Sequence, residues 1–271
     1  MKKLRIFATC LLIVCTVLTL FACKPNPANS NRQINAVNHR GYNGVAPENT
    51  LAAFRLSKEM GFDMVECDVR FTKDNKAVLL HDGTVNRTSN GKGNVDDLTL
   101  DEVRELDFGS WKDASKYAGE KIPTFEEFVA LCVEIELYPY VEVKSGATFE
   151  QMETLVEAVA NAGLAVTWIS FDKNVLSWLA DARSGDRFGL LTNLVDRDDL
   201  MFLSDLAKNV EVFIDVNHVS LTPMEINSCK SHGIPLEVWT VNSQAIIESL
   251  DEYVTGVTSD NLNAQEIFNN M

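Results

Sequence analysis

Short apolar runs alternate with longer amphipathic stretches along most of the chain. Short runs rich in apolar and β-branched residues are typical of buried strands, and the longer stretches repeat apolar positions at helical spacing. The predicted strands are 37–39, 64–70, 139–143, 166–170, 187–191, 210–216, 235–240 and 254–258. The predicted helices are 50–60, 124–136, 148–162, 173–183, 197–208, 223–232, 243–250 and 263–269.

Start signals support two of these helices. Thr124 with Glu127 and Thr222 with Glu225 form Thr-x-x-Glu capping boxes, and Pro223 occupies a first helical position. Strict alternation of strands and helices is typical of parallel βαβ units, and at this length it predicts an α/β fold, the TIM (β/α)8 barrel. A doubly wound open sheet is the alternative.

One predicted βα unit is longer than the others. Between the second strand and its helix, residues 71–123 contain an apolar run that predicts a hairpin, a Gly/Asn/Asp-rich segment at 86–94 and a short helix at 99–106. The βα loops of a barrel cover its catalytic face. We therefore predict a small insertion subdomain over that face.

The N-terminal residues have a different pattern. Three basic residues precede an apolar run at 6–20, which is short for a membrane span and typical of a secretion signal. The run ends in a Leu-Phe-Ala-Cys sequence that resembles a bacterial lipobox, with a plain secretory signal as the alternative. We expect an exported protein anchored to the cell envelope by a lipid on Cys23. The predicted parts are a lipoprotein signal peptide (1–22), a tether (23–35) and the barrel (36–271).

The composition is acidic, with 39 Asp and Glu residues against 24 Lys and Arg residues and a net charge of −15. This charge argues against nucleic acid as a partner and requires local positive charge to attract any anionic substrate. Three cysteines remain in the barrel, Cys67, Cys132 and Cys229. Because all three lie in apolar segments, we expect buried free thiols, with a bridge between Cys67 and Cys132 as the alternative.

Polar residues gather at the carboxyl ends of the predicted strands. Glu66 and Asp68 lie two residues apart and so share one face of their strand, where the two carboxylates repel. A positive group is therefore expected beside them, either a hard cation or a Lys or Arg side chain. His81 ends the next apolar run near the same rim, which suggests hydrolysis of an anion. Further polar or aromatic rim positions are His39, Arg40, Glu142, Lys144, Ser170, Asp215, Asn217, Trp239, Asn242, Ser259 and Asp260.

Eight short motifs occur in order along the chain. They are His39-Arg40-Gly41, Pro47-Glu48-Asn49-Thr50, Glu66-x-Asp68-Val69, Thr72-Lys73-Asp74, His81-Asp82, Ile122-Pro123-Thr124, Glu142-Val143-Lys144 and Trp239-Thr240-Val241-Asn242. Together they resemble the motifs of the glycerophosphodiester phosphodiesterase family over about residues 37–263. The resemblance implies a TIM barrel with an insertion between the second strand and second helix, in agreement with the irregular unit.

The resemblance also implies a metal-dependent mechanism. It implies one divalent cation, Ca2+ or Mg2+, held by Glu66, Asp68 and Glu142. It further implies that His39 and His81 share the acid and base roles, and we assign the base to His81. An imidazole suits either role because its proton affinity lies near neutral pH.

The remaining motif residues would bind the substrate. The implied substrate-binding positions are Arg40, Lys144, Glu48, Trp239 and Asn242. The implied reaction hydrolyses a small-molecule glycerophosphodiester to glycerol 3-phosphate and an alcohol through a cyclic phosphate. Two alternatives are a catalytically silent barrel that binds a phosphorylated ligand at the cell surface, and a phospholipase-type relative with an exposed apolar rim.

Two histidines lie outside the motifs. His232 precedes a glycine at the end of a predicted helix, which favours a structural role. His218 follows the sixth predicted strand closely enough to line the barrel mouth. The sequence leaves the headgroup preference and the oligomeric state open.

Overall fold

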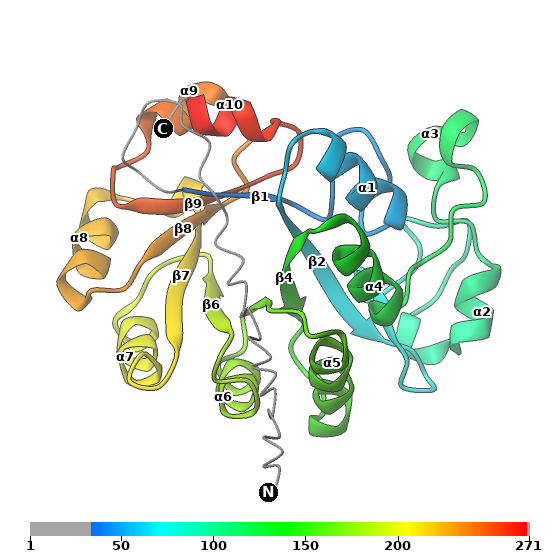
Figure 1. Ribbon diagram of the computed structural model, residues 1–271, viewed down its shortest axis with the longest axis horizontal. Helices are drawn as coiled ribbons and strands as arrows, with labels where there is room; N and C mark the ends of the chain where they lie inside the picture. Colours follow the sequence, from blue (N-terminus) through cyan, green and yellow to red (C-terminus); the bar gives the residue numbers. More distant parts are fainter. Residues whose placement is uncertain (1–33, 270–271) are drawn as a thin grey trace, which may run out of the picture.

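The strands close into a barrel in the computed structural model, which describes residues 34–269 (Figure 1). They are β1 (Asn35–Asn38), β2 (Met64–Phe71), β3 (Ala77–Leu79), β4 (Tyr138–Val143), β5 (Thr167–Ser170), β6 (Arg187–Thr192), β7 (Glu211–Asn217), β8 (Leu236–Trp239) and β9 (Val254–Ser259). Parallel neighbours follow the order β1-β9-β8-β7-β6-β5-β4-β2, and β1 also pairs with β2. This closure confirms the predicted TIM barrel and excludes the open sheet.

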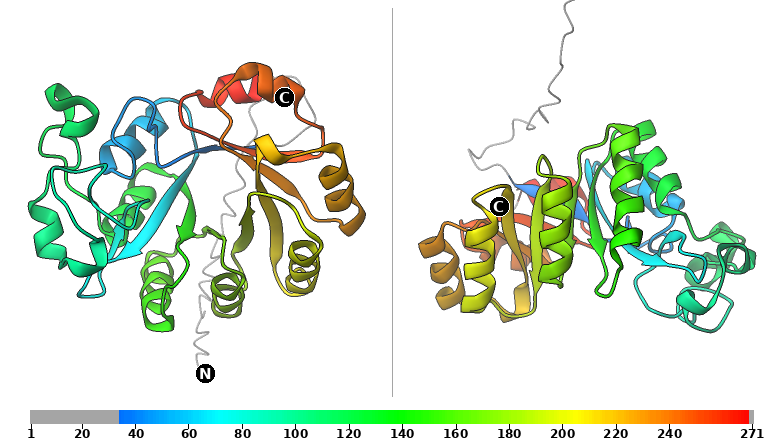
Figure 2. Two further views of the ribbon diagram at one scale, coloured as in Figure 1. Left: turned by 180° about the vertical axis from the view of Figure 1, so that it is seen from behind. Right: turned by 90° about the horizontal axis from the view of Figure 1, so that it is seen from below.

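Helices lie outside the strands in both views of Figure 2. The helices that follow the barrel strands are α1 (Leu51–Glu59), α4 (Phe125–Ile135), α5 (Phe149–Ala162), α6 (Lys173–Ala182), α7 (Arg197–Leu206), α8 (Pro223–His232), α9 (Gln244–Ser249) and α10 (Ala264–Asn269). Both predicted capping boxes form, at the starts of α4 and α8. Within residues 34–269, no helix is long and apolar enough to cross a membrane.

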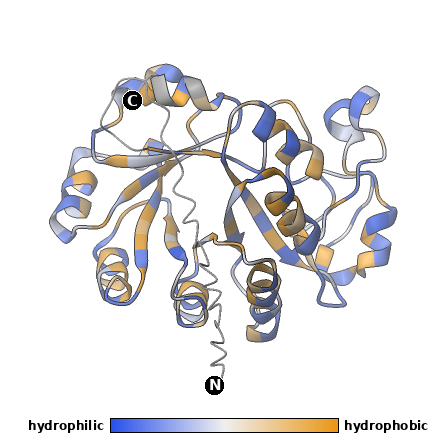
Figure 3. Ribbon diagram, in the orientation of Figure 1, coloured by the Kyte–Doolittle hydropathy of each residue, from blue (hydrophilic) through white to orange (hydrophobic). Residues whose placement is uncertain are grey.

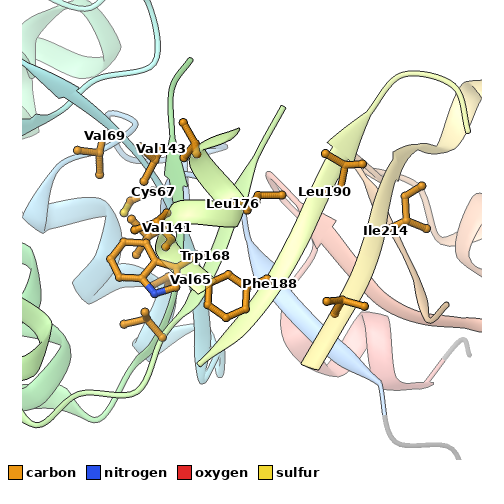
Figure 4. Close-up of a cluster of buried hydrophobic side chains, with 14 of the residues drawn as sticks. Val65, Cys67, Val69, Val141, Val143, Trp168, Leu176, Phe188, Leu190 and Ile214 are labelled. Atoms are coloured by element: carbon orange, nitrogen blue, oxygen red, sulfur yellow. The ribbon is translucent and has the colours of Figure 1, made fainter. Parts of the chain in front are cut away.

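The main core lies between the sheet and the helices. Along β2 the outward positions are apolar and the inward positions carry Glu66 and Asp68, as the two-residue period predicts. Hydrophobic positions recur along the helices and strands (Figure 3). Part of the core is drawn in Figure 4, with labelled side chains that include Val65, Cys67, Val69, Val141, Trp168 and Phe188. The three cysteines of the barrel are buried and unbridged, as predicted.

The insertion has a small core of its own. It contains β3, which is antiparallel to β2, a 3-10 turn at Val95–Asp97, α2 (Leu100–Glu105) and α3 (Ser110–Tyr117). Its buried residues are Val78, Leu80, Val85, Val95, Val103, Phe108 and Ile122. The hairpin and α2 were predicted; α3 was not, because it is polar on average and buries no residue. Figure 1 shows α2 and α3 on one side of the molecule, beyond α1 and α4.

Most of the predictions for the N-terminus concern residues outside the described range. The signal peptide, the lipidation site Cys23 and residues 23–33 of the tether lie outside the described residues. The barrel begins within the last residues assigned to the tether, since β1 starts at Asn35.

Candidate active site

Three carboxylates from β2 and β4 meet inside the barrel mouth. Asp68 pairs in register with Glu142, and Glu66 lies two residues deeper along β2. One oxygen from each of the three side chains lies within 4.8 Å of the others, and all three residues are buried. The inner face that Glu66 and Asp68 share on β2 therefore continues onto β4, where Glu142 provides a third carboxylate.

Lys144 and Arg40 supply the positive charge beside Asp68. Lys144 Nζ lies 2.5 Å from Asp68 Oδ1 and 2.6 Å from Glu142 Oε1. Arg40 Nε lies 3.2 Å from Asp68 Oδ2. Burial alone would raise the pKa of Asp68, but Lys144 and Arg40 outweigh burial and hold that pKa well below its usual range. Asp68 is thus a buried, ionised carboxylate.

The other two acids lack sufficient positive partners. Burial, followed by the charge of Asp68, raises the pKa of Glu66 well above its usual range and that of Glu142 to about 7. Glu66 Oε2 accepts a hydrogen bond from the Arg40 main-chain N–H at 2.9 Å. Glu66 Oε1 is buried and has no hydrogen-bond partner within residues 34–269. Clustered carboxylate oxygens with one unsatisfied atom fit a hard divalent cation, with Glu66, Asp68 and Glu142 as its ligands.

His39 enters the same mouth directly after β1. Its Nδ1 lies 2.7 Å from Asp260 Oδ1, and its Nε2 lies 3.9 Å from Glu66 Oε2. Asn43 and Asn242 each donate to Asp260, at 2.6 Å. Burial opposes ionisation of Asp260, but hydrogen bonds and the charge of His39 lower its pKa overall. Asp260 therefore orients the ring, and the sequence had marked it only as a rim residue.

His81 approaches from the insertion side. Its Nδ1 lies 2.8 Å from Asp82 Oδ1. Burial lowers the pKa of His81, and the charge of Asp68 opposes this effect in part. An Asp82 carboxylate at Nδ1 places the ring proton there and leaves Nε2 of the neutral ring as the acceptor. Such a ring is suited to removing a proton.

Glu48 connects two arginines beside the acids. Arg40 Nη1 donates to Glu48 Oε1 at 3.0 Å, and Arg87 donates to both Glu48 oxygens at 2.6 and 2.8 Å. Arg87 also donates from Nε to Asp82 Oδ2 at 2.8 Å. Sequence reasoning missed Arg87, because it lies in the irregular Gly/Asn/Asp-rich segment where no period marks a face.

Asn49 is a second residue whose role was missed. Its amide nitrogen donates to Asp68 Oδ2 at 2.7 Å, and its amide oxygen accepts from the Asp68 main-chain N–H at 3.1 Å. Asn49 is buried and has a left-handed φ of 56°, a conformation that asparagine tolerates better than most residues. Its place in the Pro-Glu-Asn-Thr motif was the available signal.

Five of these side chains line a pocket of about 180 Å³. Its polar wall consists of His39, Arg40, Glu66, His81 and Glu142. The opposite wall consists of Ile169, Phe171, Leu191, Asp215, Trp239, Thr240 and Thr258. The Trp239 ring packs edge-to-face against Phe171, with 5.9 Å between ring centroids. The pocket therefore fits a small anion that carries a short carbon skeleton.

The other predicted positions have separate places. Asn242 bonds to Asp260 and is not among the residues that line the pocket. His218 also lies outside this lining, with its Nδ1 3.4 Å from the Trp239 main-chain oxygen. His232 bonds to the Ser228 main-chain oxygen within α8, as a structural residue would. A larger pocket of about 420 Å³ borders the starts of β4, β6 and β7 and contains none of the predicted site residues.

A TIM barrel whose mouth combines an acidic triad, a lysine, an arginine and two carboxylate-bonded histidines has the groups required of a phosphodiester hydrolase. Comparison with known families identifies the class more closely. Residues 39–264 match the model of the glycerophosphoryl diester phosphodiesterase family. The chain belongs to this family and is an enzyme of this class.

Individual relatives agree with the family match. A glycerophosphodiester phosphodiesterase from Caldanaerobacter subterraneus subsp. tengcongensis is 34% identical, over 82% of this chain and 92% of that protein. One from Bacillus subtilis is 31% identical over 95% of each chain. The structure of an Oleispira antarctica phosphodiesterase in complex with its product sn-glycerol-3-phosphate superposes with a TM-score of 0.80 at 25% identity, covering 88% of this chain and 96% of that one.

Proposed function

We propose that this enzyme hydrolyses glycerophosphodiesters to glycerol 3-phosphate and an alcohol with the help of one divalent cation. The observation that carries this proposal is a cluster of three buried carboxylates, two of which, Glu66 and Glu142, line one pocket together with His39 and His81. The names of the similar enzymes and the product bound to the Oleispira antarctica phosphodiesterase support the substrate class.

The substrate is an anion and must be neutralised before it reacts. Arg40 and Lys144 provide fixed positive charge next to the acidic triad, and burial strengthens their field. A Ca2+ or Mg2+ ion held by Glu66, Asp68 and Glu142 would supply further positive charge to the phosphoryl oxygens. Trp239 and Phe171 would bind the carbon skeleton on the opposite wall.

The two histidines would carry the protons. His81 Nε2 takes the proton from the glycerol hydroxyl next to the phosphate, and the hydroxyl oxygen forms a bond to phosphorus. The bond from phosphorus to the headgroup oxygen breaks, and His39 Nε2 gives that oxygen a proton. Water then opens the cyclic phosphate with the two roles reversed, which restores both histidines and yields glycerol 3-phosphate.

A substrate panel tests this function. The chain lacking residues 1–23 is treated with a chelator, dialysed, and assayed with glycerophospho-choline, -ethanolamine, -glycerol and -inositol. We expect glycerol 3-phosphate to appear only after Ca2+ or Mg2+ is added back. Equal release in the continued presence of the chelator would contradict the metal dependence, and no release from any of the four would contradict the function. The silent-barrel alternative is disfavoured because all five site residues converge.

One observation favours a second substrate class, intact or lyso-phospholipids. Large apolar side chains are exposed on the segments that follow β4, β5, β6 and β7, which form the rim of the barrel mouth; they are Phe149, Phe171, Leu194, Val219 and Met224. Exposed apolar rims are typical of contact with lipid. Hydrolysis of lysophosphatidylcholine at a rate within about tenfold of glycerophosphocholine would establish this class.

We also propose that the mature enzyme is exported and anchored to the cell envelope by a lipid on Cys23. The support is the basic and apolar N-terminal segment and its lipobox-like end. Mass spectrometry of the membrane fraction is expected to show a lipid-modified N-terminal peptide that begins at Cys23. Full release of the wild-type enzyme from washed membranes, or unchanged membrane retention of the Cys23→Ala variant, would contradict the anchor.

A further inference from the structure

Asp215 is a buried carboxyl group whose role is not explained by the acidic triad. It lies on the inner face of β7, in register with Leu191 of β6 and Glu237 of β8, and only 2% of its surface is exposed. It lines the same pocket as His39 and His81, on the opposite wall. Its Oδ1 is buried without any hydrogen-bond partner in the described part of the chain.

The fold does not account for this carboxyl. In residues 34–269, the group of side chains spaced to share a metal ion consists of Glu66, Asp68 and Glu142, without Asp215. Arg187, whose charge acts on Asp215, donates to Glu237 at 2.8 Å, and among the described residues no ion pair joins it to Asp215. A buried polar atom without a partner destabilises the fold, so its retention at a pocket wall indicates a use in binding.

The surroundings indicate which chemical group Asp215 contacts. Ile169, Phe171, Leu191 and Trp239 make this half of the pocket apolar, and Asp215 is the acidic side chain within it. Burial, followed by the charge of Glu237, raises the pKa of Asp215 well above its usual range. A neutral carboxyl both donates and accepts a hydrogen bond, as a hydroxyl group does, and it attracts a cationic headgroup only weakly.

Depth in the barrel separates the two ends of the substrate. Asp215 lies two residues before the end of β7, below Asn217, whereas the variable headgroup must leave toward solvent. The end that stays in the pocket is the glyceryl group, which carries one hydroxyl next to the phosphate and one terminal hydroxyl. The first is the attacking group, and the second is free to bind the pocket wall.

We propose that Asp215 is a specificity-determining residue that hydrogen-bonds the terminal hydroxyl of the glyceryl group. This inference rests on the proposed function. Phosphodiesters in which the glyceryl group keeps the attacking hydroxyl but lacks the terminal hydroxyl are then poor substrates. Discrimination arises because such an analogue buries the Asp215 carboxyl and leaves it unpaired.

The experiment compares glycerophosphocholine with its analogue made from propane-1,2-diol, in which a hydrogen replaces the terminal hydroxyl. The enzymes are wild type, Asp215→Asn, Asp215→Val and the surface control Asp205→Ala, whose exposed carboxylate pairs with Lys208. Wild type and Asp205→Ala are expected to prefer glycerophosphocholine by about tenfold or more in kcat/KM. Asp215→Asn keeps a donor and an acceptor and retains most of this preference, whereas Asp215→Val reduces it to within about twofold, mainly through a higher KM.

Four results would overturn the inference. If the wild-type enzyme cleaves both compounds equally, the proposed function is intact but Asp215 does not have the proposed role. This conclusion holds whether or not any variant folds. A folded Asp215→Val enzyme that keeps the wild-type preference between the two compounds also removes the role of Asp215. So does a folded Asp215→Val enzyme whose only change is in the preference between choline and glycerol headgroups. Wild type that cleaves neither these compounds nor any other member of the substrate panel removes the proposed function itself, and with it this inference.

Discussion

Arg87 and Glu48 form a two-point ion pair, with Arg87 Nη1 2.6 Å from Glu48 Oε2 and Nη2 2.8 Å from Glu48 Oε1. The pair ties the insertion to the loop before α1. Since Arg87 also bonds to Asp82, it connects the partner of His81 with the partner of Arg40. Under the proposed mechanism, one guanidinium thus positions the partners of both the proposed base and a proposed phosphate-binding group.

Replacement of Arg87 is therefore expected to slow the reaction. Arg87→Ala should lower kcat by about tenfold or more, because Asp82 and Glu48 both lose an oriented donor. Arg87→Lys should recover only part of the loss, since an ammonium group lacks the planar fork that binds both carboxylates. Arg104→Ala, which removes an ion pair between α2 of the insertion and Glu127 of α4, is the control and should leave kcat unchanged. A kcat of Arg87→Ala equal to that of the control would contradict the positioning role.

The proposed mechanism predicts that His81 sets the acidic side of the pH profile. The ring acts as a base only when neutral, and burial lowers its pKa below the ordinary 6.5. As the pH falls through this lowered value, the ring gains a proton and kcat/KM falls, so the acidic limb should lie below pH 6.5. Asp82→Asn removes a hydrogen bond that raises the His81 pKa, and it should move the limb to a still lower pH. A limb above pH 6.5 in wild type, or an upward shift in the variant, would show that His81 is not the base.

Cation binding should be visible without any assay of activity. An ion that binds the folded chain stabilises it by about 2.7 kcal/mol at a concentration of one hundred times Kd. We expect Ca2+ or Mg2+ to raise the melting temperature of the wild type by several degrees and that of Glu66→Gln by much less. Asp205→Asn, at an exposed carboxylate, should respond as the wild type does. Equal shifts in wild type and Glu66→Gln would exclude Glu66 as a ligand.

The core of the barrel should be more sensitive to truncation than its rim. The fully buried Phe128 of α4 lies with its ring centroid 4.6 Å from that of Phe54 of α1. Phe128→Ala should lower the free energy of unfolding by about 3–5 kcal/mol, because it removes buried apolar area and leaves a cavity. The matched control is Phe149→Ala, at a phenylalanine that is 68% exposed, and it should cost about 0.5 kcal/mol or less. Denaturant titration that gave the two variants the same midpoint would contradict this placement of the core.

Periodicity made much of this fold predictable. The two-residue period of β2 separated Glu66 and Asp68 from the apolar residues behind them, and the βα alternation located the strand ends. Those strand ends are where the pocket lies. The joint resemblance of eight motifs then indicated the family, which the family match confirms.

Contacts between distant loops were not predictable in the same way. Arg87 reaches Glu48 across 39 positions of sequence, and Asp260 reaches His39 across 221. Periodicity describes a single strand or helix, so it cannot show which side chains meet when loops from different units pack together. Asp215 illustrates a related limit, since its place at a strand end was visible but its unpaired state depends on the neighbouring strands.

The most direct test measures glycerol 3-phosphate release by the enzyme lacking residues 1–23 and by its His39→Ala/His81→Ala double variant, with glycerophosphocholine and saturating Ca2+ or Mg2+. Melting curves with and without the cation serve to show that the variant remains folded and still binds the ion. We expect the double variant to lose at least about a thousandfold in kcat while it keeps the cation-dependent rise in melting temperature. Activity of the double variant within about tenfold of wild type would contradict catalysis by these two histidines at this pocket.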